Sequence, residues 1–175
     1  MKELSLNILD VAKNSVKAGA TRIIIRIVEA EGWRTLSIID NGCGMDPDFL
    51  ARVTDPFTTT RTTRPVGMGL PLLKLAAEQT GGEMTITSSV TPPTGTTVTA
   101  RFRMDHLDCV PVGDYASSVV TLIQGSPEID FRFEYLRPEG DIVLDTAEVR
   151  AVLGPEVPLN LPDVLVWIEG NLRGE

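Results

Sequence analysis

Residues 4 to 29 read LSLNILDVAKNSVKAGATRIIIRIVE, and this stretch changes from a helical to a strand-like pattern. Its first part carries apolar residues at spacings of one, three and four, namely Leu4, Ile8, Leu9, Ala12 and Val16. This spacing predicts a helix over residues 4 to 18, which Gly19 ends. The β-branched residues from Thr21 to Glu29 predict a strand directly after the helix.

The residues up to 104 alternate between strand-like, glycine-rich and helical patterns. A second strand is expected over residues 34 to 40, after a Glu31-Gly32 turn, and residues 41 to 46 form a glycine loop. The remaining elements are a short helix over residues 46 to 53, a loop over 54 to 68, a helix over 70 to 80, and strands over 83 to 89 and 96 to 104. We therefore expect an α+β fold, a two-layer α/β sandwich with antiparallel strand pairs.

A second, smaller unit is expected over residues 106 to 175, after a first domain of residues 1 to 105. Residues 115 to 124 are apolar and fit either a helix or a strand by their period, and we favour a helix. The segments that follow predict a hairpin of residues 130 to 136 and 141 to 144, and two short helices over 146 to 153 and 161 to 172. This unit is a small α+β extension.

Charge divides the chain in the same place. The net charge is -8, with 12 Lys and Arg against 11 Asp and Glu up to residue 105, and 4 against 13 after it. Such a negative second part repels phosphate backbones, so nucleic acid is excluded as its expected partner. No apolar run reaches the roughly 20 residues of a membrane span, and the amino terminus lacks a secretory signal, so we expect a cytoplasmic protein.

A narrow polar stripe lies on the first predicted helix. Asp10, Asn14 and Lys17 are spaced by four and three residues, which places them on one face. A solvated helix face accounts for this stripe as well as a binding site does. The alternative is that the Asn14 amide oxygen binds Mg²⁺ and the lysine attracts phosphates.

Two glycine-rich stretches add to that stripe. Asp40 ends an apolar strand and precedes Gly42, Gly44 and Met45, so its carboxylate can accept a hydrogen bond from an exocyclic amine while the glycines admit a flat base. The same Asp-Asn-Gly is also an ordinary hairpin signal. The second stretch, residues 67 to 72, reads GMGLPL and enters a helix, where free N–H groups favour phosphate. Neither stretch completes a dinucleotide fingerprint or a P-loop.

Taken together and in order, these segments resemble the GHKL superfamily of ATPases and kinases, which includes gyrase, a heat-shock chaperone, MutL and sensor histidine kinases. LDVAKNSVKAGATRI is similar to its N-box, IIDNGCGMD to its first glycine box, and DPFTTTR to the phenylalanine box of histidine kinases. GMGLPLLKLAAEQTGGEMTI is similar to the second glycine box and GTTVTARF to the closing strand. The resemblance covers residues 4 to 103 and implies the Bergerat ATP-binding fold.

The resemblance also implies roles for single residues. Asn14 would be the Mg²⁺ ligand, and Asp40 would bind adenine between Gly42, Gly44 and Met45, with Thr96 reaching the base through water. Lys17 and Arg61 would face the phosphates of ATP. Residues 54 to 68 would form the ATP lid, and Gly67, Gly69 and Leu70 would begin the helix beneath the triphosphate.

One departure concerns catalysis. Hydrolytic members of the superfamily carry a glutamate four residues before the metal-binding asparagine, and here that position is Asp10. Aspartate can act as a general base, but its carboxylate lies one methylene group further back, and a misplacement of about 1 Å costs about a hundredfold in rate.

Three functions remain open. The first is a stand-alone kinase or ATPase that acts on a protein partner, expected because few residues precede the N-box and leave no room for dimerising helices with a phosphoacceptor histidine. The second is a slow ATPase whose lid movement switches partner binding, as its likeness to MutL suggests. The third is a nucleotide-sensing module without turnover. In each case the acidic second unit is the expected docking site for the protein partner.

Overall fold

The computed structural model describes residues 3 to 54 and 69 to 175. The predicted lid from residue 55 onward, including Arg61 and Gly67, lies outside these described residues. The elements are α1 (Leu4–Lys17), β1 (Arg22–Ala30), β2 (Trp33–Asp40), α2 (Pro47–Leu50), α4 (Gly69–Gln79), β3 (Glu83–Ser89), β4 (Gly95–Arg103), α5 (Tyr115–Gly125), β5 (Asp130–Leu136), β6 (Ile142–Asp145), α6 (Thr146–Leu153) and α7 (Pro162–Leu172).

The strands form one six-stranded sheet in the order β3-β4-β2-β1-β5-β6. The β1–β2 hairpin turns at Glu31 and Gly32, as predicted from the sequence, and the φ angles of both residues are positive. In this hairpin Ile25 pairs with Ile38. The β2–β4 and β3–β4 pairs are antiparallel as well. The antiparallel pairs expected in the first hundred residues are therefore confirmed.

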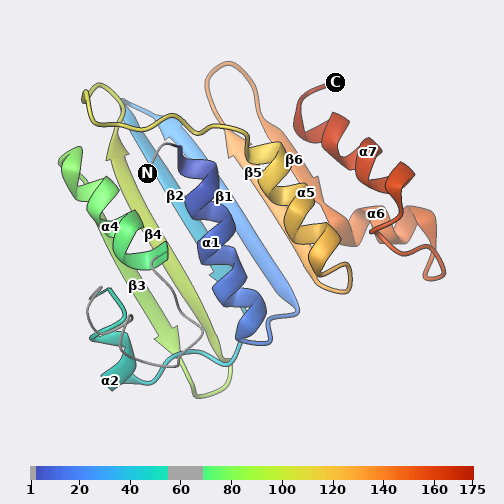
Figure 1. Cartoon of the computed structure of the whole chain (residues 1–175), viewed down its shortest axis with the longest axis horizontal. Helices are drawn as coiled ribbons and strands as arrows, with labels where there is room; N and C mark the ends of the chain where they lie inside the picture. The colour runs from blue at the N-terminus through green and yellow to red at the C-terminus, as the bar shows by residue number, and fades with distance from the viewer. Residues whose placement is uncertain (1–2, 55–68) are drawn as a thin grey trace.

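A layer of helices covers one face of this sheet. Figure 1 shows α4, α1 and α5 side by side in front of the strands. Alternate residues of β1 are fully buried beneath them, including Ile23, Ile25 and Ile27, and Ile8 of α1 is equally buried above. The predicted two-layer α+β sandwich is confirmed.

The second part of the chain continues the same sheet. β5 pairs in parallel with β1, placing Phe133 beside Ile25, and β6 completes the edge. The segment that fitted either a helix or a strand is the helix α5, which packs beside α1 (Figure 1). This segment is a helix because it connects β4 to β5, two parallel strands of one sheet, and such a connection crosses over the face of the sheet. The boundary near residue 105 stays a prediction, and the segments on its two sides share one sheet.

The beginning of α1 depends on the second part. Glu3 gives no side-chain cap, so the first N–H groups of the helix need other acceptors. The N–H groups of Leu4 and Ser5 donate to the carbonyls of Pro111 and Val112 at 2.9 and 2.8 Å. The hydroxyl of Ser118 in α5 donates to the Ser5 carbonyl at 2.8 Å. The first helix is therefore anchored by residues more than a hundred positions away.

Helix α2 is shorter than predicted. Asp46 caps it by accepting a hydrogen bond from the Phe49 N–H at 2.9 Å, as its sequence indicates, but the helix ends at Leu50 and not at Val53. The N–H groups of Arg52 and Val53 donate to carbonyls three residues earlier in the chain, and not four as in an α-helix. The last turn is therefore tighter than an α-helical turn. Among the described residues, no helix is long and apolar enough to span a membrane.

Candidate nucleotide-binding site

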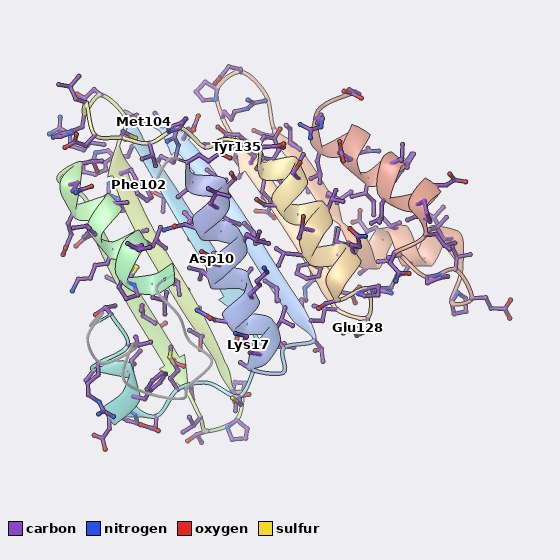
Figure 2. The ribbon with its side chains drawn as sticks, viewed as in Figure 1. Asp10, Lys17, Phe102, Met104, Glu128 and Tyr135 are labelled. Atoms are coloured by element: carbon purple, nitrogen blue, oxygen red, sulfur yellow. The ribbon has the colours of Figure 1, made fainter. Side chains whose placement is uncertain are left out.

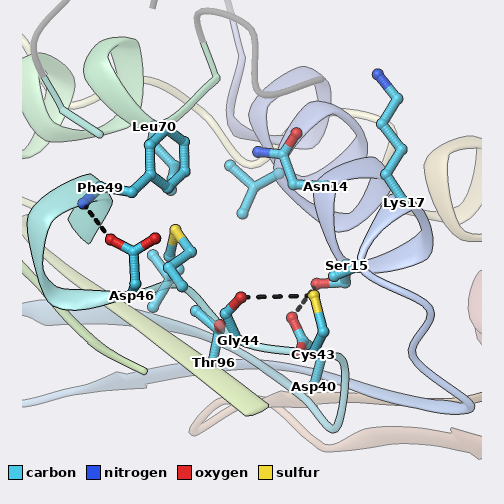
Figure 3. A pocket seen from close by; sticks show the side chains of 14 residues that line it. Asn14, Ser15, Lys17, Asp40, Cys43, Gly44, Asp46, Phe49, Leu70 and Thr96 are labelled. Atoms are coloured by element: carbon cyan, nitrogen blue, oxygen red, sulfur yellow. Dashed lines mark hydrogen bonds between the residues drawn. The ribbon is translucent and has the colours of Figure 1, made fainter. Parts of the chain in front are cut away.

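A pocket of about 210 Å³ opens between α1, the loop after β2, α2 and the first turn of α4. Figure 3 shows Asp40 and Thr96 on the sheet side of this pocket and Asn14 and Lys17 on α1. The lining residues are Val11, Asn14, Ser15, Lys17, Ala18, Asp40, Cys43, Gly44, Met45, Asp46, Phe49, Leu70, Thr96 and Val98.

Asp40 is held at the pocket wall by two donors. The Gly42 N–H donates to Oδ1 at 2.9 Å, and the Ser15 hydroxyl donates to Oδ2 at 2.5 Å (Figure 3). Ser15 is 4% exposed, so its hydroxyl is directed at the carboxylate and not at solvent. Each carboxylate oxygen keeps a second lone-pair site, so Asp40 can still accept a hydrogen bond from a ligand.

The neighbouring glycines are required by the packing of the chain itself. Gly44 has φ +80°, and a Cβ there would lie 2.0 Å from the Ser89 carbonyl oxygen. A Cβ on Gly42 would lie 2.8 Å from the Ala18 Cβ. The Cβ positions of these glycines are filled by Ser89 of β3 and by Ala18 at the end of α1. That they also admit a flat base stays a prediction.

Thr96 is tied to the glycine loop through a residue that sequence analysis missed. Its hydroxyl lies 2.7 Å from the Ser88 hydroxyl, which also accepts from the Met45 N–H at 2.8 Å. Ser88 therefore links β3, β4 and the loop at the base of the pocket. Apolar side chains complete this side, since Met45, Val98 and Phe49 line it too.

Asn14 brings an unsatisfied polar group to the pocket. Its Nδ2 is buried and has no hydrogen-bond partner in the part of the chain that the structure describes. A buried amide without a partner is costly, which is consistent with a side chain that is completed by a ligand. The described residues hold no group of three His, Cys, Asp or Glu, so a cation here would take most of its oxygens from the ligand and from water.

Asp10 and Gly69 lie beside the pocket and not in its wall. Asp10 is exposed about midway along α1, whereas Lys17 lies at the helix end (Figure 2). A Cβ on Gly69 would lie 3.2 Å from the Asp10 Cβ and 3.5 Å from Val11, so glycine allows α4 to begin close to α1. Leu70 follows at 2% exposure and does line the pocket.

The family model described as histidine kinase-, DNA gyrase B-, and HSP90-like ATPase matches residues 2–106. The chain belongs to this family. Its match ends just after β4 and includes every residue that lines the pocket. The GHKL resemblance expected from the motifs is thereby confirmed.

Relatives of this ATPase domain include kinases and repair proteins. It is 34% identical over 91 residues to the signal transduction histidine-protein kinase AtoS of Escherichia coli (strain K12), covering 50% of this chain and 14% of AtoS. It is 40% identical over 52 residues to the DNA mismatch repair protein MutL of Chlorobaculum tepidum, covering 30% of this chain and 8% of MutL. The chain thus spans a small part of the length of these relatives.

One solved structure extends the likeness in fold beyond the family match. The N-terminal domain of a DNA repair protein has a TM-score of 0.57 to this chain and covers 87% of it and 57% of that chain, at 17% identity. Residues 2–106, which the family model matches, make up 60% of this chain, so the structural alignment covers more of the chain than the family match does. The likeness in fold therefore includes residues of the acidic second part.

Sequence analysis identified seven of the fourteen residues that line the pocket, but not the residues that support Asp40 and Thr96. Ser15, Ser88 and Phe49 were missed. Ser15 had a usable signal, since it lies four residues after Val11 on the buried side of the predicted helix, where a serine needs a partner. Ser88 had none, because its partners Met45 and Thr96 come from other elements.

Proposed function

We propose that the pocket binds ATP together with Mg²⁺. Asp40 would accept a hydrogen bond from the adenine amino group, with Gly42, Gly44 and Met45 around the base and Thr96 contacting it through water. The single observation that carries this proposal is the orientation of the Asp40 carboxylate by Ser15 and Gly42 inside a pocket with an apolar side. A fixed carboxylate can recognise an amine without reorganising, which favours affinity.

In this proposal the phosphates lie toward the C-terminal half of α1 and the start of α4. Asn14 would bind Mg²⁺ through its amide oxygen. Its Nδ2, which has no partner among the described residues, would be left to donate a hydrogen bond to a phosphate oxygen. When bound, the cation would neutralise charge on the phosphates. Lys17 and Arg61 would contact the phosphates as cations, and Gly67, Gly69 and Leu70 would begin the helix beneath them.

We further propose that the protein is an ATP-dependent kinase or ATPase that acts on a protein partner. Its family and its similarity to AtoS support this activity. These 175 residues contain one histidine, His106, which is exposed in the segment after β4 and outside the pocket, so a phosphoacceptor outside these residues is the simpler arrangement. Asp10 would be the candidate general base, taking a proton from the attacking water or hydroxyl.

A second candidate is an ATP-dependent switch with little or no turnover. Two observations favour it: Asp10 replaces the glutamate of hydrolytic relatives, and part of the chain is similar to MutL. In this case ATP would change the conformation that the partner recognises, and hydrolysis would be slow or absent.

Two measurements test the proposals. Calorimetry with ATP should give binding that strengthens on addition of Mg²⁺, and no binding in either condition would reject the pocket assignment. Turnover is followed as release of radiolabelled γ-phosphate or its transfer to protein in a lysate, for the wild type and Asp10→Asn. Turnover lost in the variant with ATP affinity within a few-fold supports the enzyme, whereas ATP binding without turnover supports the switch.

The partner and location belong to the same proposal. The acidic residues after 105 would dock a protein and disfavour nucleic acid. We place the protein in the cytoplasm, where its two free cysteines, Cys43 and Cys109, would remain reduced.

A further inference from the structure

A second hollow, which we call the α6–α7 groove, lies at the opposite edge of the sheet from α4. It is formed by the edge strand β6 and the helices α6 and α7, seen in orange and red in Figure 1. Its volume is about 640 Å³, and seven of its eleven lining residues are apolar. The lining residues are Val143, Leu144, Asp145, Glu148, Val149, Val152, Leu153, Asp163, Val164, Trp167 and Asn171.

The groove exposes large apolar side chains. Trp167 is 55% exposed, Val152 is 85% exposed and Val143 is 50% exposed. Single exposed apolar residues are common, but several gathered around one hollow with a tryptophan mark a binding surface. Nothing in the folding of the described chain covers these side chains.

The rim of the groove is acidic. Glu148 on α6 and Asp163 on α7 are exposed and make no ion pair with any described residue. From residue 145 to the end there are six Asp and Glu against two Arg. Both arginines are engaged elsewhere, Arg150 with Asp130 and Arg173 with Asp114 and Glu169. Among the residues that the structure describes, the negative charge at the rim is therefore not neutralised by an ion pair.

We propose that the α6–α7 groove binds a basic amphipathic helix of a partner protein. The apolar face of such a helix would cover Trp167 and Val152, and its Lys or Arg residues would lie against Glu148 and Asp163. A second copy of this chain fits poorly, because it would bring two equally acidic rims together. This proposal rests on the proposed function, in which the acidic second part docks a protein partner. It adds the chemistry of that partner and places its docking surface away from the nucleotide pocket.

The probe is a synthetic helical peptide of leucine and lysine, about 18 residues long, so that it can form a helix on binding. A matched peptide carries glutamate at every lysine position. The protein is the full chain with Trp33→Phe, which leaves Trp167 as its one tryptophan. The lysine peptide should shift Trp167 emission to shorter wavelength, with an affinity that falls as salt is added, and the glutamate peptide should give no shift.

Two pairs of variants locate the binding. Val152→Lys should weaken binding of the lysine peptide at least about tenfold, whereas Leu107→Lys, an equal change at a fully exposed leucine outside the groove, should not. Glu148→Gln with Asp163→Asn should weaken binding and flatten its salt dependence. Glu78→Gln, at an exposed position on α4, is the control for charge. Because all of these positions are exposed, the variants are expected to fold.

Several results would overturn the inference. These are equal affinity for both peptides, equal effects of Val152→Lys and Leu107→Lys, or no binding of the lysine peptide. Sedimentation that shows a dimer broken by Val152→Lys would assign the groove to a second copy. ATP affinity is measured on the same samples, so loss of ATP binding with intact peptide binding counts against the proposed function and not against the groove.

Discussion

Asp40 shows how one side chain depends on its neighbours. Its two oxygens accept from different donors, a backbone N–H two residues later and the Ser15 hydroxyl from α1. The backbone donor comes from the local turn, whereas the hydroxyl is available only because α1 packs over the end of β2. The carboxylate is thus oriented by both local and tertiary contacts.

We expect Asp40→Asn to weaken ATP binding by about 1.5 to 3 kcal/mol, the range for a hydrogen bond that involves a charged group. The amide has one acceptor oxygen, which the Gly42 N–H would use, so an NH₂ group would face Ser15 and the ligand. Calorimetry measures the change. An Asp46→Asn variant, at another acidic position of the pocket wall, should bind ATP far better than Asp40→Asn.

Ser15→Ala should have a smaller effect in the same direction, roughly 1 kcal/mol, because the carboxylate remains but loses one of its two orienting donors. Ser15→Thr, which keeps the hydroxyl, should recover part of the loss. If alanine and wild type bind ATP equally, the hydroxyl has no positioning role.

Asn14→Ala tests the metal assignment. We expect it to weaken ATP binding about tenfold or more with Mg²⁺ present, and to change little when the metal is removed with a chelator, because only the metal complex uses the amide oxygen. Titrations with and without Mg²⁺ measure the difference. Equal losses in both conditions would remove Asn14 from the ligand set.

At the scale of elements, charged side chains connect the strands on the face of the sheet away from the helices. Glu134 of β5 accepts from Arg26 Nε of β1 at 2.6 Å and from Arg132 Nε at 2.5 Å. Asp145 of β6 pairs with Arg22 and Arg132. This network joins β1, β5 and β6, so it links the two parts of the chain across the parallel pair.

The network should make stability depend on pH. The hydrogen bond from Arg26 is the main cause that lowers the pKa of Glu134 below its ordinary value of 4.5, so the folded state binds fewer protons there than the unfolded state. The stabilisation is present above pH 4.5 and is lost as the pH falls through the folded-state pKa. Glu134→Gln should therefore cost about 1 to 2 kcal/mol at pH 7 and progressively less below pH 4.5.

Urea unfolding at several pH values measures this difference in the free energy of unfolding. Glu139→Gln, in the exposed turn between β5 and β6, is the matched control and should change stability little at any pH. A constant difference between Glu134→Gln and wild type from pH 7 to pH 3 would contradict the assignment.

At the scale of the whole molecule, direct contacts through α1 connect the pocket to the acidic second part. The pocket lies entirely within residues 11 to 98, yet α1, which carries part of it, receives hydrogen bonds at its first turn from Pro111 and Val112. α5 covers the side of α1 that α4 leaves free, and β5 covers the edge of β1. A partner bound at the second part could therefore influence α1 through direct contacts.

A truncation that ends at Met104 should be much less stable than the full chain. It exposes the edge of β1 and the apolar side of α1, and it removes the acceptors of the Leu4 and Ser5 N–H groups. We expect the midpoint of thermal unfolding to fall by more than about 10 °C, with residual ATP binding in the folded fraction. A truncation as stable as the full chain would show that residues 1 to 104 do not need residues 106 to 175 for their stability.

How much the sequence could predict depends on the range of the interactions. The periods of residues 4 to 18 and 21 to 29 decided the first helix and strand, because apolar spacing reflects a face that one element must bury. The motifs around Asn14 and Asp40 indicated the family, which the match over residues 2–106 confirms. The roles of the single site residues stay predictions, and Arg61 and Gly67 lie outside the described residues.

Only the tertiary structure decided how these pieces meet. The parallel β1–β5 pair joins Ile25 to Phe133, and no local pattern in either strand specifies the other as its neighbour. The bond from Ser15 to Asp40 and the link from Ser88 to Met45 likewise join separate elements. Sequence by itself determined most of the helices and strands and the motifs they carry, whereas residues 115 to 124 fitted either a helix or a strand by their period. Strand order, the supports of Asp40 and the α6–α7 groove arise from packing between distant segments, which local periodicity does not encode.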